Sequence, residues 1–280
     1  MIYKKVLSVL LIVLSINDSY LIAQADITLK RKADHLAQEF IIVDGHVDLP
    51  YRLSVKNFRL QKEYLAIPYQ SNEGDFDFVR SKKGGLNAPF MSIFIPSRLQ
   101  IEGGAKELAD SLINMVEYIA ENQSAYFSIA KNPKDVIRAK KQGKIALPMG
   151  MENGAPLEND LSLVTYFKKR GISYITLTHA KDNKICDSSY DTTHTWKGLS
   201  PFGYQLLDEM QRVGIMVDIS HVSDSAFYQT IRYVKVPVIA SHSSCRKFTP
   251  GFERNMSDEM IKMMKGNDGI IMVNFGSSFL

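Results

Sequence analysis

The sequence has 280 residues, of which 45% are hydrophobic and 23% are charged. This composition is ordinary for a globular protein with a sizeable core and excludes an intrinsically disordered chain. The formal net charge of +4 comes from Lys and Arg residues scattered along the chain without a basic run, so nucleic acid is not expected as a partner.

The N-terminus has the layout of a secretory signal peptide. Two lysines precede an apolar run over residues 6–16, and small residues follow at Ala23 and Ala25. The run is too short for a permanent membrane span, and no later stretch reaches the ~20 apolar residues that a transmembrane helix needs. We expect residues 1–25 to be removed and residues 26–280 to be exported, to the periplasm or outside the cell. An uncleaved N-terminal anchor is the alternative.

The first strand is expected at residues 41–43, which lead into a polar cluster that ends at Asp48. Side chains alternate along a strand, so His46 and Asp48 point the same way, with Asp44 behind them. Imidazole nitrogen and carboxylate oxygen together suit zinc and its first-row neighbours better than calcium or magnesium. The segment therefore predicts half of a metal site, the alternative being a strand that simply runs into a turn.

The rest of the first half is less regular. Residues 26–40 are compatible with a helix, and the glycine-interrupted segment 51–88 is expected to be a long excursion over one end of the fold. The elements expected next are a strand at 90–95, a helix at 104–122 and a strand at 144–147 that leads to Glu152.

The second half repeats a unit of strand, loop and helix. The expected strands are 172–177, 215–219, 236–240 and 269–275. One helix is expected at about 160–170, and a second starts at Ser200-Pro201 and ends at Gly214. Ser223 and Ser257 are expected to cap two more helices, the last of which is closed by Gly266. Three of these strands are followed closely by a histidine: His179, His221 and His242. The alternation predicts a parallel sheet, either an open doubly wound sheet or a closed (β/α) barrel.

The polar side chains at the strand ends favour the barrel. In a barrel the C-terminal ends of all strands open onto one face, whereas an open sheet would spread the same side chains along a line at ~4.8 Å per strand. We therefore predict an α/β fold of the (β/α)8 TIM-barrel type.

Five of these side chains form a candidate metal-ligand set. They are His46, Asp48, Glu152, His221 and His242. Five ligands serve two three-ligand metal sites only if Glu152 is shared between them. A water held by two divalent cations is strongly acidified, and the same cations polarise a carbonyl, so the reaction predicted is hydrolysis of an amide or similar bond.

Six motifs occur in order between residues 41 and 275. They are Asp-Gly-His-x-Asp-Leu-Pro from Asp44, Gly-Met-Glu-Asn-Gly from Gly150, Leu-Thr-His ending at His179, Gly-Leu-Ser-Pro-Phe-Gly from Gly198, Asp-Ile-Ser-His-Val-Ser from Asp218, and Ser-His-Ser-Ser from Ser241 with Arg254-Asn255. Together they resemble the membrane (renal) dipeptidase family of the metal-dependent amidohydrolase superfamily.

The resemblance implies an exported zinc-dependent dipeptidase with two zinc ions. His46, Asp48 and Glu152 would hold one ion. Glu152, His221 and His242 would hold the other, which makes Glu152 the catalytic residue that bridges the two ions.

The resemblance also implies how a substrate is bound. His179 and Arg254 would contact it, Arg254 through paired hydrogen bonds to the terminal carboxylate of a dipeptide. Several family members accept a D-residue at the C-terminal position, which extends the expected substrates. The expected partner is thus a dipeptide, and a homodimer is left open.

Two features depart from the family pattern. Ala155 and Pro156 stand where the family often has a histidine, which would alter the pocket lining. The family's Gly-x-Asp-Phe-Asp-Gly motif, whose first Asp is thought to handle proton transfers, is not found, and about seven strands are visible where a barrel has eight. We therefore expect a chain truncated before the last barrel strand, with residues 26–280 inactive on their own.

Two other functions are left open by the residues. One is a catalytically inactive metal- or peptide-binding protein, because every metal ligand is present while the proton-transfer Asp is not. The other is a different amidohydrolase, such as a deaminase or phosphotriesterase, which His179 and Arg254 do not support. Cys186 and Cys245 can form one disulfide or none.

Overall fold

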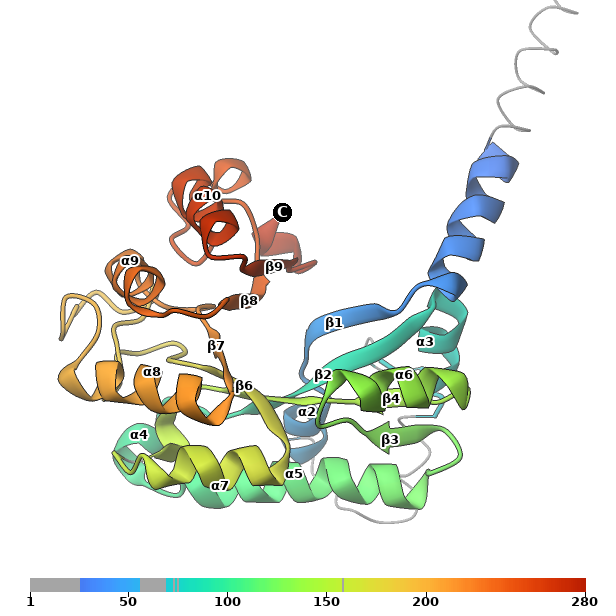
Figure 1. The fold of residues 1–280 in the computed structure, drawn as a ribbon, viewed down its shortest axis with the longest axis horizontal. Helices are drawn as coiled ribbons and strands as arrows, with labels where there is room; N and C mark the ends of the chain where they lie inside the picture. Colours follow the sequence, from blue (N-terminus) through green and yellow to red (C-terminus); the bar gives the residue numbers. More distant parts are fainter. Residues whose placement is uncertain (1–25, 56–68, 73, 75, 158) are drawn as a thin grey trace, which may run out of the picture.

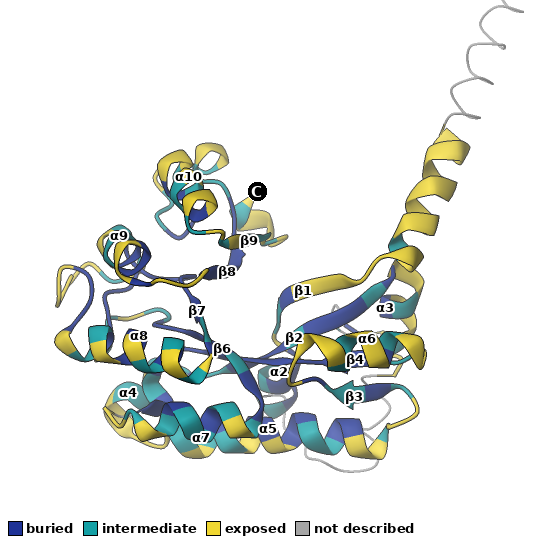
Figure 2. Cartoon of the chain, in the orientation of Figure 1, coloured by how far each residue is buried: buried dark blue, intermediate teal, exposed yellow. Residues whose placement is uncertain are grey.

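The protein is described by a computed structural model that covers residues 26–55, 69–72, 74, 76–157 and 159–280 (Figure 1). The expected signal peptide lies outside the described residues, as does part of the excursion at 51–88. Within the described ranges, no helix is long and apolar enough to cross a membrane. Residues 26–39 form the expected N-terminal helix, which is almost wholly exposed and projects away from the body (Figure 2).

Seven parallel strands form one curved sheet in the order β1-β2-β5-β6-β7-β8-β9 (Figure 1). The strands are β1 (Ile42–Val47), β2 (Leu86–Phe94), β5 (Met149–Glu152), β6 (Ile172–Thr176), β7 (Met216–Asp218), β8 (Ile239–Ser243) and β9 (Ile270–Val273). Strands that follow one another in the chain are neighbours in the sheet, which is the order of a (β/α) barrel.

The sheet curls until β1 returns to β8. A Cβ on Gly45 of β1 would lie 2.2 Å from the backbone oxygen of Ser241 in β8 and 2.3 Å from Sδ of Met272 in β9. Only glycine allows two backbones to approach this closely. The result is a nearly closed barrel with β1 and β9 as its outer strands, so the predicted TIM-type architecture is confirmed.

Helices follow the strands on the outside of the sheet (Figure 1). They are α2 (Leu49–Val55), α3 (Phe78–Gly84), α4 (Leu99–Glu102), α5 (Ala105–Asn122), α6 (Pro133–Lys141), α7 (Ser162–Arg170), α8 (Pro201–Val213), α9 (Asp224–Tyr233) and α10 (Asp258–Gly266). Ser200, Ser223 and Ser257 cap α8, α9 and α10 by accepting a backbone N–H of the first turn, as the sequence predicts.

Three sequence-based boundaries are wrong. The strand expected at 144–147 does not lead straight to Glu152: β4 (Ile145–Leu147) pairs with β3 (Phe127–Ile129) in a separate two-stranded sheet, and β5 starts afresh after Pro148. A proline has no N–H to donate to a ladder, which explains the break.

The other two differences concern β8 and the excursion at 51–88. The strand expected at 236–240 lies at Ile239–Ser243, because Ile239 pairs with both Asp218 and Ile270. The excursion contains α2 and α3, the latter capped by Asp77, whose side chain accepts a hydrogen bond from the N–H of Arg80.

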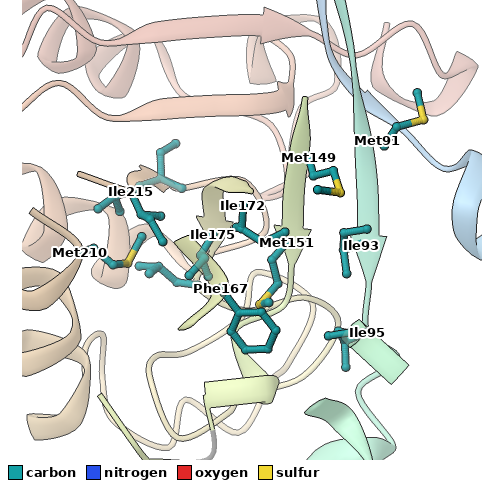
Figure 3. Close-up of a cluster of buried hydrophobic side chains, with 14 of the residues drawn as sticks. Met91, Ile93, Ile95, Met149, Met151, Phe167, Ile172, Ile175, Met210 and Ile215 are labelled. Atoms are coloured by element: carbon teal, nitrogen blue, oxygen red, sulfur yellow. The ribbon is translucent and has the colours of Figure 1, made fainter. Parts of the chain in front are cut away.

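The main core lies between the outer face of the sheet and the helices (Figure 3). Met91 and Ile93 of β2 and Met149 and Met151 of β5 point outward into it, each at most 1% exposed. Burying side chains of this size stabilises the fold by about 1.5–3 kcal/mol each. Because side chains alternate along a strand, the residues between them, such as Ser92, face the inside of the barrel.

Candidate metal centre

The predicted metal ligands come from different strands and meet at one carboxylate. Glu152 is the last residue of β5 and is 4% exposed. Four imidazole Nε2 atoms surround its carboxylate, at distances of 2.9 Å (His221), 3.2 Å (His242) and 3.7 Å (His179) from Oε1 and 3.4 Å (His46) from Oε2. The C-terminal ends of the strands thus converge as the barrel topology requires.

Asp48 lies at the edge of this cluster. Its Oδ1 is 3.2 Å from Nε2 of His46, but its side chain is 60% exposed. Oδ1 of Asp44 accepts a hydrogen bond from the backbone N–H of His46 at 2.9 Å, so this oxygen is not directed at the candidate metal ligands. Asp48 is therefore within reach of a cation on His46 while staying open to the cavity.

In the part of the chain that the structure describes, two groups of three ligand atoms are compact enough to hold a cation, and both contain Glu152. One group is His46, Glu152 and His242, and the other is Glu152, His179 and His221. The shared position of Glu152 agrees with the sequence interpretation, but the histidines are divided between the groups differently. Which residues hold which ion therefore stays a prediction.

The protonation of the cluster suits cations. Burial lowers the pKa of His221 well below its usual range and that of His242 to about 4, outweighing the nearby Glu152 charge. Their Nε2 atoms nevertheless lie 2.9 Å apart, beside the same carboxylate oxygen. Lone pairs that converge in this way, from nitrogen and oxygen together, match what zinc-like cations need, so the residues present fit a metal.

Glu152 and His46 carry the charge of the cluster. Burial would raise the pKa of Glu152, but the His46 charge and hydrogen bonds from His221 and His242 hold it well below its usual range. Burial would lower the pKa of His46, but the charge of Glu152 and hydrogen bonds with Asp48 and Glu152 raise it to about 10. A metal must displace a proton to reach such a nitrogen, which couples metal binding to proton release.

Two residues of the centre have left-handed backbones although neither is glycine. Asn153, directly after Glu152, has φ 78°, and His221 has φ 70°. Asn153 is held there by hydrogen bonds from Nδ2 to the backbone oxygen of Ile95 and to Oε1 of Gln100, both 3.0 Å. Conformations of this kind cost on the order of 1–3 kcal/mol and cluster at functional sites.

Arg254 is a buried cation beside the centre. It is 3% exposed, and its Nη1 and Nη2 donate to Oγ of Ser243 and the backbone oxygen of His242, both at 2.7 Å. Its Nε has no partner among the described residues, and no carboxylate of that part of the chain forms an ion pair with it. Burial lowers the pKa of Arg254. A buried guanidinium without a counter-ion is suited to receive an anionic ligand.

A cavity of about 1100 Å³ joins these groups. Its lining includes the four histidines around Glu152 together with Arg254, and it extends to Phe275 and Phe279 beyond β9. His179 is 23% exposed at its side chain and packs edge-on against Phe94, with ring centroids 4.7 Å apart. Both residues assigned to the substrate thus line the space that contains the candidate metal ligands.

Sequence reasoning assigned no role to three polar residues behind the ligands. Tyr174 donates from Oη to the backbone oxygen of Gly45 at 2.9 Å and lies 3.3 Å from Nδ1 of His46. Asp218 and Ser241 form a similar contact behind His242. Asp218 and Ser241 occur in motifs quoted above, but the sequence does not show that they contact each other. That contact follows from their inward position on the neighbouring strands β7 and β8.

Cys186 and Cys245 are both free thiols, which settles the open question of a disulfide between them.

Comparison with known proteins places the chain in a family. The family model "Membrane dipeptidase (Peptidase family M19)" matches residues 30–280. Dipeptidase tcpJ of Claviceps purpurea is 32% identical over 244 residues, which cover 83% of this chain and 56% of that protein. Dipeptidase 3 of Rattus norvegicus is 29% identical over 262 residues, which cover 91% and 52%. The chain therefore spans just over half the length of these relatives.

Solved structures share the fold. The probable dipeptidase PvdM from Pseudomonas aeruginosa superposes with a TM-score of 0.76 at 24% identity, covering 87% of this chain and 62% of that one. A metallo peptidase from Rhodobacter sphaeroides, liganded with a phosphinate mimic of the dipeptide L-Ala-D-Ala, gives 0.77 at 22% identity, with coverage of 86% and 75%. Since the family model extends over almost all of the described residues, the chain belongs to the membrane dipeptidase family, peptidase family M19.

Proposed function

We propose that this chain carries the metal centre and substrate pocket of a zinc-dependent enzyme that hydrolyses dipeptides. The observation that carries the proposal is the set of four imidazoles whose Nε2 atoms lie within 3.7 Å of the Glu152 carboxylate. The ligand of the Rhodobacter protein, a mimic of L-Ala-D-Ala, supports dipeptides with a C-terminal D-residue as substrates.

The residues that would hold two zinc ions are His46 and Asp48 on one side, His221 and His242 on the other, and Glu152 between them. When bound, such a pair of ions supplies an acidified water and polarises the scissile carbonyl. Glu152 contributes by keeping its carboxylate ionised inside the barrel, since its pKa is held well below the usual range by His46, although burial alone would raise it.

Arg254 and His179 would orient the dipeptide. The buried guanidinium of Arg254 can bind the terminal carboxylate, which fixes the peptide bond at a set distance from the metal centre. Burial lowers the pKa of His179, so its ring is neutral at pH 7 and can exchange a hydrogen bond with a substrate oxygen on the cavity side. A terminal carboxylate held this close to the metal centre would favour short peptides such as dipeptides.

Zinc removal tests the proposal. We expect the metal-free protein to lose binding of a phosphinate mimic of L-Ala-D-Ala, and added zinc to restore it, while magnesium does not, because the nitrogen-rich ligand set suits zinc. Isothermal titration calorimetry on metal-free and zinc-loaded protein measures both steps. Equal binding with and without zinc would contradict the proposal.

Activity assays run beside these titrations separate the two other functions considered. If residues 26–280 are inactive by themselves, the protein binds the mimic but does not hydrolyse L-Ala-D-Ala. That inactivity stays a prediction. Hydrolysis of a phosphotriester or deamination of a nucleobase, with no dipeptide binding, would favour another amidohydrolase. A homodimer also stays a prediction.

We also propose that the protein is exported. The layout of residues 1–25 supports this, and we expect the mature chain to begin near Gln24 or Asp26. N-terminal sequencing of the protein recovered from its native cell measures this start. An intact Met1 in a soluble cytoplasmic fraction would show that the proposal is wrong.

A further inference from the structure

The buried carboxylate of Asp218 is an acceptor for four hydrogen bonds. Its Oδ1 accepts the backbone N–H groups of Ser220 at 3.0 Å and Ser241 at 2.9 Å. Its Oδ2 accepts the hydroxyl groups of Thr176 at 2.5 Å and Ser241 at 2.6 Å. Thr176, Asp218 and Ser241 are all at most 2% exposed. Water therefore does not compete for these bonds, and the direction of each is set by the carboxylate.

The hydroxyl of Ser241 determines which ring nitrogen of His242 carries the hydrogen. Ser241 has a single hydroxyl hydrogen, and that hydrogen is donated to Asp218. Only lone pairs of Oγ are then left for Nδ1 of His242, which lies 2.8 Å away. Nδ1 must carry the hydrogen of this contact. A neutral imidazole has one N–H, so Nε2 of His242 is left with a lone pair.

The other side of His242 agrees with this arrangement. Its Nε2 faces Oε1 of Glu152 at 3.2 Å and Nε2 of His221 at 2.9 Å. A lone pair on Nε2 of His242 therefore faces the space between these candidate metal ligands.

We propose that Asp218 is a positioning residue that acts through Ser241 to hold His242 in the tautomer with its Nε2 lone pair directed at the metal centre. The inference rests on the proposed function in treating His242 as a metal ligand. Asp218 itself does not contact the centre. Groups that hold the other ring nitrogen of a metal-binding histidine fix its tautomer and raise its basicity, and their loss typically lowers metal affinity about 10- to 100-fold.

A parallel contact lies behind His46. Tyr174 donates its hydroxyl hydrogen to the backbone oxygen of Gly45, so its Oη can only accept from Nδ1 of His46 at 3.3 Å. Space for the Tyr174 ring depends on Gly150, where a Cβ would lie 2.0 Å from the ring. Nδ1 of His46 therefore donates to Tyr174, and its Nε2 faces Glu152.

Asp218→Asn is the decisive variant because it reverses the direction of donation with almost no change in shape. The amide oxygen is expected to stay on the two backbone N–H groups, which places the NH2 group against the hydroxyls of Thr176 and Ser241. Ser241 then accepts from the amide and turns its own hydrogen toward Nδ1 of His242. The ring hydrogen moves to Nε2, where it blocks the metal.

Two measurements test this on the full chain. Imidazole ¹⁵N NMR of the metal-free protein at neutral pH should show His242, assigned with His242→Gln, as the Nδ1–H tautomer in the wild type and as the Nε2–H tautomer in Asp218→Asn. Chelator competition should show an apparent zinc affinity lowered about 10- to 100-fold in the variant.

Thr176→Val is the matched control. It removes a hydrogen bond to the same carboxylate oxygen but leaves the contacts of Ser241 with Asp218 and His242 in place. We expect the wild-type tautomer and wild-type zinc affinity. Should Asp218→Asn fail to fold, Ser241→Ala takes its place: it frees Nδ1 of His242 from its acceptor, so the tautomer signal becomes mixed and zinc affinity falls.

The proposal would be overturned if Asp218→Asn or Ser241→Ala kept the wild-type proportion of the Nδ1–H tautomer. It would also be overturned if Thr176→Val lowered zinc affinity as much as Asp218→Asn does. Failure of the proposed function is distinguishable, because it shows as a wild type that binds no zinc. The tautomer is read without metal and tests the role of Asp218 in either case.

Discussion

Replacing Glu152 by glutamine is expected to remove both zinc ions from the protein together. The carboxylate lies within 3.7 Å of all four imidazoles, so its charge would serve both of the proposed ions. An amide of the same shape lacks that charge and presents an NH2 group to one side of the centre. We expect zinc affinity to fall by more than the roughly 100-fold that loss of an outer partner costs.

Metal analysis of purified variants measures this result. His46→Ala should mainly reduce one of the two ions, because His46 approaches only the Oε2 side of the carboxylate. Glu117→Gln is a matched control: Glu117 is a partly buried carboxylate paired with Arg170 at 3.2 Å, away from the barrel interior. It should keep the wild-type metal content. An unchanged zinc content in Glu152→Gln would refute the shared role.

Replacing Arg254 by alanine is expected to weaken binding of a phosphinate dipeptide mimic by roughly 30- to 4,000-fold. This range corresponds to the 2–5 kcal/mol that truncating one partner of a buried, hydrogen-bonded charge pair typically costs. Arg254 is buried and has no ion-pair partner among the described residues, so the carboxylate of a ligand can complete the pair. Arg254→Lys should be intermediate, since it keeps the charge and loses the fork of donors.

Calorimetry with two ligands separates binding from folding. A mimic whose C-terminal carboxylate is replaced by an amide should bind wild type and Arg254→Ala with similar, weak affinity. Arg246→Ala is the matched control, because Arg246 already pairs with both oxygens of Asp224, at 2.6 and 2.7 Å. It should leave mimic binding unchanged. Equal affinity of wild type and Arg254→Ala for the carboxylate mimic would rule out the anchoring role.

Local signals in the sequence were sufficient for the helices of the second half and for the type of fold. Ser200, Ser223 and Ser257 cap helices as expected, because a cap depends only on residues within one turn. The regular alternation of strand and helix predicted a parallel sheet, either open or closed. The polar side chains at the strand ends then favoured the barrel, because in a barrel the C-terminal ends of all strands open onto one face.

Strand boundaries needed the tertiary structure. β8 was expected at residues 236–240, where the chain is apolar, but it forms at Ile239–Ser243. Pairing with β7 and β9 decides its register, and those partners are distant in the sequence. Pro148 likewise divides a continuous apolar stretch between two sheets, because only one of its neighbouring strands can join the barrel ladder.

The order of the motifs determined which side chains gather at the mouth of the barrel, while only the tertiary structure decided how they are held. The contact from Asp218 through Ser241 to His242 joins residues more than twenty positions apart and depends on the inward face and curvature of the sheet. The burial of Arg254 without an ion-pair partner among the described residues depends on the same packing. Sequence patterns report periodicity and turn chemistry within a few residues. Hydrogen-bond direction and charge pairing depend on residues from different strands, which come into contact only when the sheet curls into a barrel.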